Sequence, residues 1–467
     1  LKMLNLYNSY TKQQEEVNLN QEDVRIYLCG PTVQSSPHLG HGRSAVVFDF
    51  FIRYLKFLNY SVLYVRNITD IDDKIIQKSQ EKNINYRELA ESVWEEFVQA
   101  HENLNCLVPD IEPRATAYVP EIVQYIDQLI KNGFGYITKS GVYYDVSKFD
   151  DYLKLSGRST EEVKTGTRIE TEEDKKSPED FALWKFSKEG EPSWDSPWGV
   201  GRPGWHIECS TMINQTLGKT IDFHCGGIDL IFPHHENEIA QSKGVEKNEN
   251  FVNYWLHNGM LNLSGKKMSK SDGNVKLLNE YIDQYGGEVV RFFFLRAHYR
   301  SPQEFSQDLL EESRKTLNNI QEYTKDLKSE PVDSKVLEIF KACMNDDMNT
   351  PKLLGEIFQM INESNNLEDY EENQRKQTVK FIFEILGFQL KMSDKSIKDE
   401  KLLSEFFLLY DIKFTEIDTA MSEFTSIRNK LRNEKKYGEA DEMRDSILKI
   451  GIVINDGENV GWYWKNS

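Results

Sequence analysis

Two kinds of hydrophobic pattern alternate along the first half of the chain. Residues 24–28 form a short apolar run that Gly30-Pro31 ends, and the following residues 45–58 repeat apolar side chains at helical spacing. A second strand is expected at residues 61–66, followed by a helix from about Asp70. A strand, a helix and a second, parallel strand predict the start of a doubly wound sheet, which binds nucleotides at the carboxyl ends of its strands.

The pattern changes twice further along. Between residues 148 and 203, Glu, Lys, Ser, Gly and Pro dominate, which indicates an insertion between two halves of the nucleotide fold, or alternatively an exposed linker. Helices at residues 206–217 and 233–243, with a strand at 220–224, then predict the second half of that fold. Beyond Ser301 the chain is predicted to be all helical to about Leu386, and its end predicts helices followed by two short strands.

Composition narrows the class of protein. A chain of 467 residues is too long for one compact core, so two to four domains are expected. The net formal charge of −19 argues against a surface that grips nucleic acid everywhere, although it leaves room for a local basic track. Five widely spaced cysteines do not form a secreted disulfide framework, and the sequence shows neither a signal peptide nor a membrane-spanning helix, so a cytoplasmic protein is expected.

The segment His38-Leu39-Gly40-His41 lies where the first strand passes into the first helix. The free N–H groups at a helix N-terminus attract anions, and imidazoles can donate to phosphate oxygens. A glycine lets a base or phosphate approach the backbone. The pattern predicts a phosphate site, although such a segment on its own can be an ordinary turn.

Candidate metal ligands gather between His224 and Gln241. On a helix starting near Pro233, His234 and Glu238 are four residues apart and share one face, which fits either metal ligands or an ion pair within the helix. Two thiols, those of Cys29 and Cys209, could complete a tetrahedral zinc site.

A lysine-rich segment, Lys267-Met268-Ser269-Lys270-Ser271, is by itself typical of a solvated turn. Together with the earlier His-x-Gly-His, however, it resembles the two signatures of class I aminoacyl-tRNA synthetases. The segments LCGPTV, NITDIDDKI, GRPGWHIECS and GGIDLIFPHHENEIAQ also occur in the order seen in cysteinyl-tRNA synthetases, and this likeness covers essentially the whole chain.

The resemblance implies roles for individual residues. The family's zinc ligands match Cys29, Cys209, His234 and Glu238, with one Zn²⁺ per chain. Catalysis would fall to His38, His41, Lys267 and Lys270, and ATP with Mg²⁺ would be bound by these residues together with Gly40, Gly227 and Asp229. The substrate cysteine would be surrounded by Thr69, Trp205 and His224. Cys225 departs from the family pattern, which more often has glycine there, and is either a spare thiol or a small residue.

The implied reaction activates L-cysteine with ATP and transfers it to the 3′ end of tRNA(Cys). The expected fold is α/β: a Rossmann-like doubly wound parallel sheet with an insertion, followed by an all-helical domain and a small mixed α/β C-terminal domain. The expected boundaries are 1–120 and 204–250 for the two halves of the catalytic fold, 121–203 for the insertion, 251–300 for a stem-contact region with the KMSKS loop, 301–401 for a helical bundle, and 402–467 for an anticodon-binding domain. A monomer that does not bind membranes is expected.

The last part of the chain contains candidate tRNA contacts. Basic residues crowd one short stretch, and aromatic residues end the chain; they are Arg428, Lys430, Arg432, Lys435, Lys436, Trp462 and Trp464. Cations for phosphates and rings for unstacked bases suit a single-stranded anticodon loop. A solvated helix face with a small core is an equally good interpretation of this composition.

Two other functions are compatible with parts of the sequence. A ligase that joins cysteine to an amino sugar resembles the same catalytic half, but it has no use for helices from Ser301 and a basic C-terminal unit. A catalytically idle RNA-binding relative is expected to lose ligands or the second lysine, and both are present here.

Overall fold

The molecule is built around a four-stranded parallel sheet. The computed structural model describes residues 3–166, 174–246, 250–263, 266–267, 277–325, 327, 330–364, 367–390, 400–414, 416–450, 452–455 and 461–464. The sheet has the order β10-β9-β3-β4 and comprises β3 (Val24–Leu28), β4 (Val62–Arg66), β9 (Ile221–Gly227) and β10 (Val252–Asn258). All three strand pairs are parallel, so the carboxyl ends of these strands meet at one edge, as the sequence predicted.

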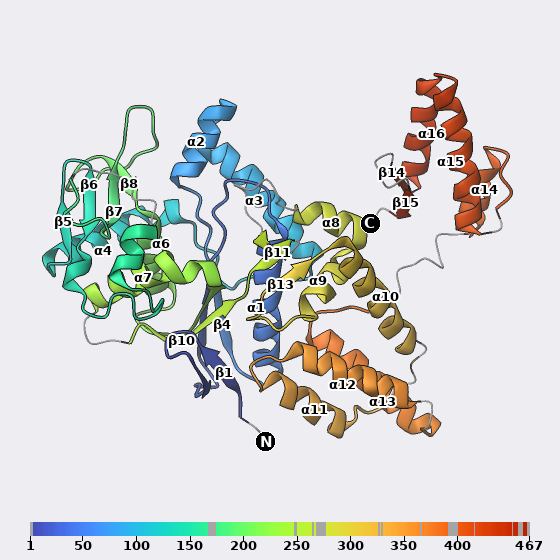
Figure 1. Ribbon diagram of the computed structural model, residues 1–467, viewed down its shortest axis with the longest axis horizontal. Helices are drawn as coiled ribbons and strands as arrows, with labels where there is room; N and C mark the ends of the chain where they lie inside the picture. The colour runs from blue at the N-terminus through green and yellow to red at the C-terminus, as the bar shows by residue number, and fades with distance from the viewer. Residues whose placement is uncertain are drawn as a thin grey trace.

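Helix α1 (Leu39–Phe57) connects β3 to β4 and packs on the sheet (Figure 1). Its apolar residues form a wide buried face, and the ring of Phe51 meets that of Phe223 of β9 edge-on, with centroids 4.9 Å apart. Helices α2 (Asp73–Lys82) and α3 (Tyr86–Asn103) follow β4, and each begins at a side chain that accepts a hydrogen bond from the first turn, Asp72 and Asn85 respectively. On the other half of the fold lie α6 (Trp205–Thr216) and α7 (Glu236–Val245).

The insertion is a folded unit rather than a linker. Four strands make an antiparallel sheet in sequence order: β5 (Gly135–Ile137), β6 (Gly141–Tyr144), β7 (Phe181–Phe186) and β8 (Gly201–Pro203). Helix α4 (Val119–Lys131) packs beside it, and α5 (Thr160–Gly166) lies between β6 and β7 in the chain. Trp184 is fully buried here, so one of the tryptophans in this segment forms a core and not an exposed wall.

Two small sheets contain strands that were not expected from the sequence. A hairpin of β1 (Asn5–Asn8) and β2 (Gln13–Glu16) precedes the nucleotide fold. A second sheet joins β11 (Leu261–Leu263), β12 (Lys266–Lys267) and β13 (Gln303–Phe305). The prediction that the chain is all helical from Ser301 is therefore wrong at β13, whose three residues are too short to show alternation but pair in parallel with β11.

The helical part shares its hydrophobic core with the nucleotide fold. Helix α8 (Leu278–Tyr285) and α9 (Gly287–Leu295) lead into α10 (Gln307–Tyr323), α11 (Ser334–Met344), α12 (Thr350–Glu363) and α13 (Asp369–Ile385). Phe340 of α11 packs against Tyr54 and Phe57 of α1, with ring centroids 5.6 and 5.5 Å apart. Arg291 of α9 is fully buried, pairs with Asp49 of α1 and donates to the carbonyl of Leu386, which fixes the end of α13 to the catalytic fold.

The C-terminal unit has a core of its own. It contains α14 (Glu400–Leu408), α15 (Ile417–Asn433) and α16 (Tyr437–Lys449), followed by the antiparallel pair β14 (Ile452–Asn455) and β15 (Gly461–Trp464). Phe407, Phe424 and Ile447 lie at the centre of its buried cluster, and Figure 1 shows this unit apart from the remaining elements. The helices followed by two short strands confirm the predicted order of elements. No helix among the described residues is both long and apolar enough to cross a membrane.

Candidate active site and metal centre

The candidate site lies at the edge where the parallel strands end. Cys29 directly follows β3, and its N–H donates to the carbonyl of Cys225 in β9 at 3.1 Å. His224 also lies in β9, Cys209 lies in α6, and a short π-helical turn (η4, Ile231–His235) carries His234 into α7. Residues more than 200 positions apart in the chain therefore meet at one place, because the doubly wound topology brings both halves to the same edge.

The four residues predicted as metal ligands lie together. The Cys29 and Cys209 sulfurs, an imidazole nitrogen of His234 and a carboxylate oxygen of Glu238 all lie within 4.8 Å of one another. His234 Nε2 is 3.0 Å from Glu238 Oε1, and Cys209, His234 and Glu238 are at most 2% exposed. Two thiolates, one imidazole and one carboxylate make a donor set that suits tetrahedral zinc.

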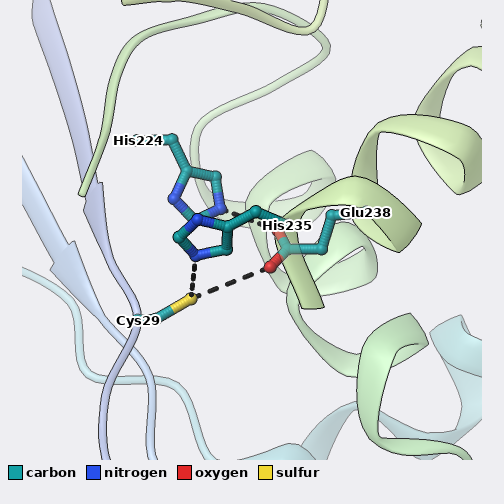
Figure 2. Close-up of side chains that lie close together, drawn as sticks. All are labelled: Cys29, His224, His235 and Glu238. Carbon is teal, nitrogen blue, oxygen red and sulfur yellow. Dashed lines mark hydrogen bonds and ion pairs between the residues drawn. The ribbon is translucent and has the colours of Figure 1, made fainter. Parts of the chain in front are cut away.

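A second set of donors overlaps the first. Figure 2 shows Cys29 facing His224, His235 and Glu238, and these four also have donor atoms within 4.8 Å of one another. His224 Nε2 lies 2.7 Å from Glu238 Oε2, and His235 Nε2 lies 3.3 Å from the Cys29 sulfur. His224 thus contacts the carboxylate oxygen that faces away from His234. This arrangement suits residues that orient the ligands of the first set, as hydrogen-bonded partners of metal ligands commonly do.

Burial and mutual charge set the protonation of the cluster. Burial alone lowers the pKa of His234, but the charges of Glu238 and Cys209 outweigh it and raise that pKa to about 10. Burial alone raises the pKa of Glu238, but His224 and His234 outweigh it and lower that pKa to about 2. A hydrogen bond from Cys29 lowers the pKa of Cys209, and burial raises the pKa of Cys29. The pocket therefore favours one thiolate and an ionised His–Glu pair before any metal is bound.

The two histidines of the His-x-Gly-His segment meet at the start of α1. His38 is the N-cap residue, its N–H donates to His41 Nδ1 at 3.1 Å, and the two rings stack with centroids 3.6 Å apart. A Cβ on Gly40 would lie 3.1 Å from the His38 ring, so a larger residue would crowd that imidazole. The N-terminus of a 19-residue helix with two imidazoles beside it is a suitable anion site.

Residues on both sides of the second signature are held next to the first. Leu278, just after it, donates its N–H to the carbonyl of Pro37 at 2.9 Å. Gly259 and Met260 precede the second signature, and their carbonyls accept hydrogen bonds of 2.9 and 2.8 Å from the fully buried guanidinium of Arg43 in α1. Lys267 ends β12, and Lys270 lies outside the described residues. The lysine-bearing segment thus starts and ends beside α1, where the predicted phosphate site lies.

The remaining predicted residues lie around the same edge. Trp205 stacks on His234, with ring centroids 4.3 Å apart, and Thr69 donates its N–H to the carbonyl of Pro31 at 3.1 Å. Asp229 is exposed just after β9, and a Cβ on Gly227 would lie 2.5 Å from its Oδ1, so a larger residue would displace that carboxylate. Cys225 points away from the metal ligands into the core that contains Phe223, which fits a small buried residue.

Several residues of the site were missed by the sequence analysis. His206 Nδ1 lies 3.0 Å from His234 Nδ1, and His235 Nδ1 lies 2.8 Å from His257 Nε2. The hydroxyl of Tyr27, in β3, is buried without a hydrogen-bond partner among the described residues. His206 and His235 stand within the segments that carried the resemblance, so their position was a usable signal. His257 and Tyr27 stand outside those segments, and only the tertiary fold brings them close.

The predicted tRNA track divides into two kinds of residue. Lys430, Arg432, Lys435 and Lys436 are exposed at the end of α15 and the turn that follows it. Arg428 is only 2% exposed and donates to the carbonyl of Ala440 at 3.0 Å, so it connects α15 to α16 and does not contribute to the exposed surface. Trp462 is half-buried against the core of this unit, and nothing is described of the Trp464 side chain.

Comparison with known proteins identifies the family. The family described as "tRNA synthetases class I (C) catalytic domain" matches residues 15–315, and the DALR domain matches residues 339–391. The cysteine–tRNA ligase of Persephonella marina is 41% identical over 99% of this chain and 100% of its own length. The chain belongs to the cysteine–tRNA ligase family. The ligases of Aquifex aeolicus and Methanococcus maripaludis are 39% and 40% identical, each over 99% of both chains.

Two solved structures share the fold of this chain. The methionyl-tRNA synthetase of Mycobacterium tuberculosis in complex with methionyl-adenylate has a TM-score of 0.58 at 15% identity and covers 82% of this chain and 94% of its own. A putative arginyl-tRNA synthetase from Campylobacter jejuni has a TM-score of 0.55 at 14% identity, with 80% of this chain and 94% of that chain covered. The predicted fold class and the predicted family are both confirmed.

Proposed function

We propose that this enzyme activates L-cysteine with ATP to cysteinyl-adenylate and pyrophosphate, and then transfers the cysteine to the 3′ end of tRNA(Cys). The observation that carries the proposal is the cluster of Cys29, Cys209, His234 and Glu238 at the carboxyl edge of a nucleotide-binding sheet. A site that must recognise a thiol has a use for a thiophilic metal, and this donor set fits zinc.

Zinc would supply the selection of sulfur over oxygen. Serine differs from cysteine by one atom, and a pocket that discriminates by size alone separates such pairs poorly. A bound zinc ion stabilises a thiolate, whereas the hydroxyl of serine stays protonated and is a poorer ligand. His224 and His206, which contact Glu238 and His234, would hold those two side chains in their orientation.

The activation step needs the ATP phosphates held in line with the cysteine carboxylate. The N-terminus of α1, with His38, Gly40 and His41, would bind the phosphates, and Mg²⁺ would accompany ATP. Gly227 and Asp229 would hold the ribose, because a carboxylate can accept from two hydroxyls. As the cysteine carboxylate attacks the α-phosphorus, Lys267 and Lys270 would neutralise the charge that grows on the departing pyrophosphate.

Thr69, Trp205 and His224 would surround the bound cysteine. Trp205 stacks on His234 and so covers one side of the metal ligands, while His224 contacts Glu238 from the other. For the second step, the exposed cations Lys430, Arg432, Lys435 and Lys436, with Trp462 and Trp464 nearby in sequence, would hold the tRNA by its phosphates and bases.

Pyrophosphate exchange into ATP tests this function. The zinc-loaded enzyme should catalyse exchange with L-cysteine and should stay at background with L-serine at the same concentration. Exchange that requires no amino acid, or equal exchange with serine, would contradict the proposal. Charging of tRNA(Cys), assayed beside an amino sugar as acceptor, then separates a tRNA ligase from a small-acceptor ligase.

A further inference from the structure

Glu208 is a buried carboxyl group without an ionic partner next to the metal cluster. It lies in α6 directly before Cys209 and is 1% exposed. Neither of its oxygens accepts a hydrogen bond of regular geometry within the part of the chain that the structure describes. The neighbouring groups Cys209, Asp70 and Asp72 are acidic as well, so none of them supplies a positive charge to Glu208. A buried carboxylate without a partner is destabilising, and a bound cation would stabilise it.

The other carboxyl groups of this region already have partners. Glu238 is paired with His224 and His234. Asp70 accepts hydrogen bonds from the N–H and the hydroxyl of Thr116, at 2.9 and 2.6 Å. Asp72 caps α2 by accepting from the N–H of Lys74 at 2.8 Å. Among these groups, Glu208 is therefore the one left to meet an incoming ligand.

The position of Glu208 points to the space where cysteine is proposed to bind. It follows Trp205 by three residues and so lies on the same face of α6, and Trp205 stacks on the metal ligand His234. The Thr69 hydroxyl lies within reach of the Glu208 carboxyl. The carboxyl group thus lies near Cys209, its neighbour in the chain, and near a residue expected to surround the substrate.

The chemistry of L-cysteine supplies the missing cation. Its ammonium group is two carbons away from its sulfur. If the sulfur is bound at the metal, the ammonium must therefore lie close to the metal ligands, among them Cys209. The substrate carboxylate must meanwhile stay free to attack ATP. Of the three polar groups of cysteine, the ammonium is the one whose charge is opposite to that of an ionised Glu208.

We propose that Glu208, with the hydroxyl of Thr69 beside it, binds the ammonium group of the substrate cysteine. This inference rests on the proposed function, since it takes cysteine as the substrate. It adds a second point of recognition to the metal: the metal selects the thiol, and Glu208 selects an α-amino acid over other small thiols. It also leaves the carboxylate as the group directed to ATP.

Binding of paired thiols tests this assignment without relying on turnover. In the Co²⁺-substituted enzyme, a thiol that joins the metal adds to the sulfur-to-cobalt absorption, so L-cysteine and 3-mercaptopropionate, which lacks the amino group, can be titrated directly. Glu208→Gln should weaken cysteine about 10- to 150-fold, the range for a lost hydrogen bond to a charged group, and leave 3-mercaptopropionate nearly unchanged. Equal weakening of both thiols, or no weakening of cysteine, would overturn the proposal.

A matched variant controls for the loss of a buried carboxylate. Glu236 is also fully buried, on α7, but its Oε2 accepts from the N–H of Ser156 at 2.8 Å. Glu236→Gln should leave the ratio of the two thiol affinities at its wild-type value. A change in that ratio as large as that caused by Glu208→Gln would show a general effect of buried charge and overturn the assignment.

The wild-type enzyme gives an answer even if Glu208→Gln does not fold. Cysteamine keeps the ammonium but lacks the carboxylate, so it should bind at least about tenfold more tightly than 3-mercaptopropionate. Equal affinities, or tighter binding of 3-mercaptopropionate, would contradict a carboxylate at the ammonium position. If no thiol, cysteine included, changes the cobalt absorption of the wild-type enzyme, it is the proposed metal-based function that fails.

Discussion

The proposed metal cluster and the proposed tRNA-binding surface of the C-terminal unit differ in burial and in the kind of ligand they suit. At the cluster, the half-buried Cys29 after β3 and buried residues of α6, η4 and α7 surround one small volume, and Cys29, His234 and Glu238 have further contacts. On the C-terminal unit, Lys430, Arg432, Lys435 and Lys436 are exposed on one short stretch. Selecting one atom of a small substrate requires fixed, desolvated donors, whereas holding a polyanion requires only accessible charge.

The largest expected effect is the loss of a metal ligand. Cys209→Ala should remove most of the zinc and lower cysteine-dependent pyrophosphate exchange by more than about a hundredfold. Mutation of a residue that only hydrogen-bonds to a metal ligand typically lowers metal affinity or activity about 10- to 100-fold, and loss of a ligand itself should lower them more. Zinc content per chain is the measurement. Cys225→Ala is the matched control, since Cys225 faces the core, and it should keep one zinc. Full zinc in Cys209→Ala would contradict the ligand set.

The next largest effect concerns the charge on the leaving group. Lys270→Ala should slow adenylate formation about a hundredfold, equivalent to about 3 kcal/mol, and change cysteine affinity little. Single-turnover formation of the adenylate measures this step. An unchanged rate together with a raised requirement for cysteine would show that Lys270 acts in binding. Lys82, an exposed residue at the end of α2, provides a control substitution.

Removing the C-terminal unit separates the two regions. A chain that ends before Glu400 should catalyse pyrophosphate exchange within about twofold of the full chain, because the cluster and α1 precede Ser301 and the unit has its own core. Charging of tRNA(Cys) should fall more than about tenfold as phosphate contacts are lost. A folded truncation that charges tRNA normally would show that this unit is structural only.

Much of the fold could be predicted because local pattern and topology agree. The strand at Val24–Leu28 is where the apolar run predicted it, and α1 follows after the loop of residues 29–38. The parallel pairing of β3 with β4 then follows from the strand–helix–strand order. By contrast, β12 and β13 have two and three residues, too few to show a period, and they form because partner strands are supplied from elsewhere.

The site shows the same division. The four proposed ligands were found because their residue types are chemically distinctive and stand in segments that resemble a family. Arg428 was misjudged as part of the exposed track, because neighbouring basic residues look alike in sequence and only packing of α15 on α16 buries one of them. His257 could not be found either, since a single histidine in an apolar strand carries no signal until His235 is brought 2.8 Å away.

A smaller effect distinguishes the exposed cations from the buried one. Substituting Lys435 and Lys436 by Ala should weaken tRNA binding and reduce the slope of log affinity against log salt by about 2, one for each lost phosphate contact. Arg428→Ala should instead lower the unfolding free energy of the C-terminal unit by about 1–3 kcal/mol, since a buried carbonyl loses its donor. Tight tRNA binding with an unchanged salt slope in the lysine variant would place the tRNA elsewhere.

The smallest expected effect is the release of protons when zinc binds to the proposed ligands. The pKa of His234 is raised to about 10 and burial raises that of Cys29, so both hold their protons near neutral pH. Zinc binding to the metal-free enzyme should therefore release about two protons and become tighter as pH rises. Calorimetry in buffers of different ionisation enthalpy counts these protons. Zinc affinity that does not depend on pH would contradict the proposed ligands.

The central claim is that the metal itself selects the substrate by its sulfur. The most direct measurement is the absorption of the Co²⁺-substituted enzyme during titration with L-cysteine and, separately, with L-serine. Cysteine should increase the sulfur-to-cobalt absorption, as one more thiolate joins the metal, and serine should leave it unchanged. Cysteine that is activated normally without any change in this absorption would show that its sulfur is recognised elsewhere, and the claim would be wrong.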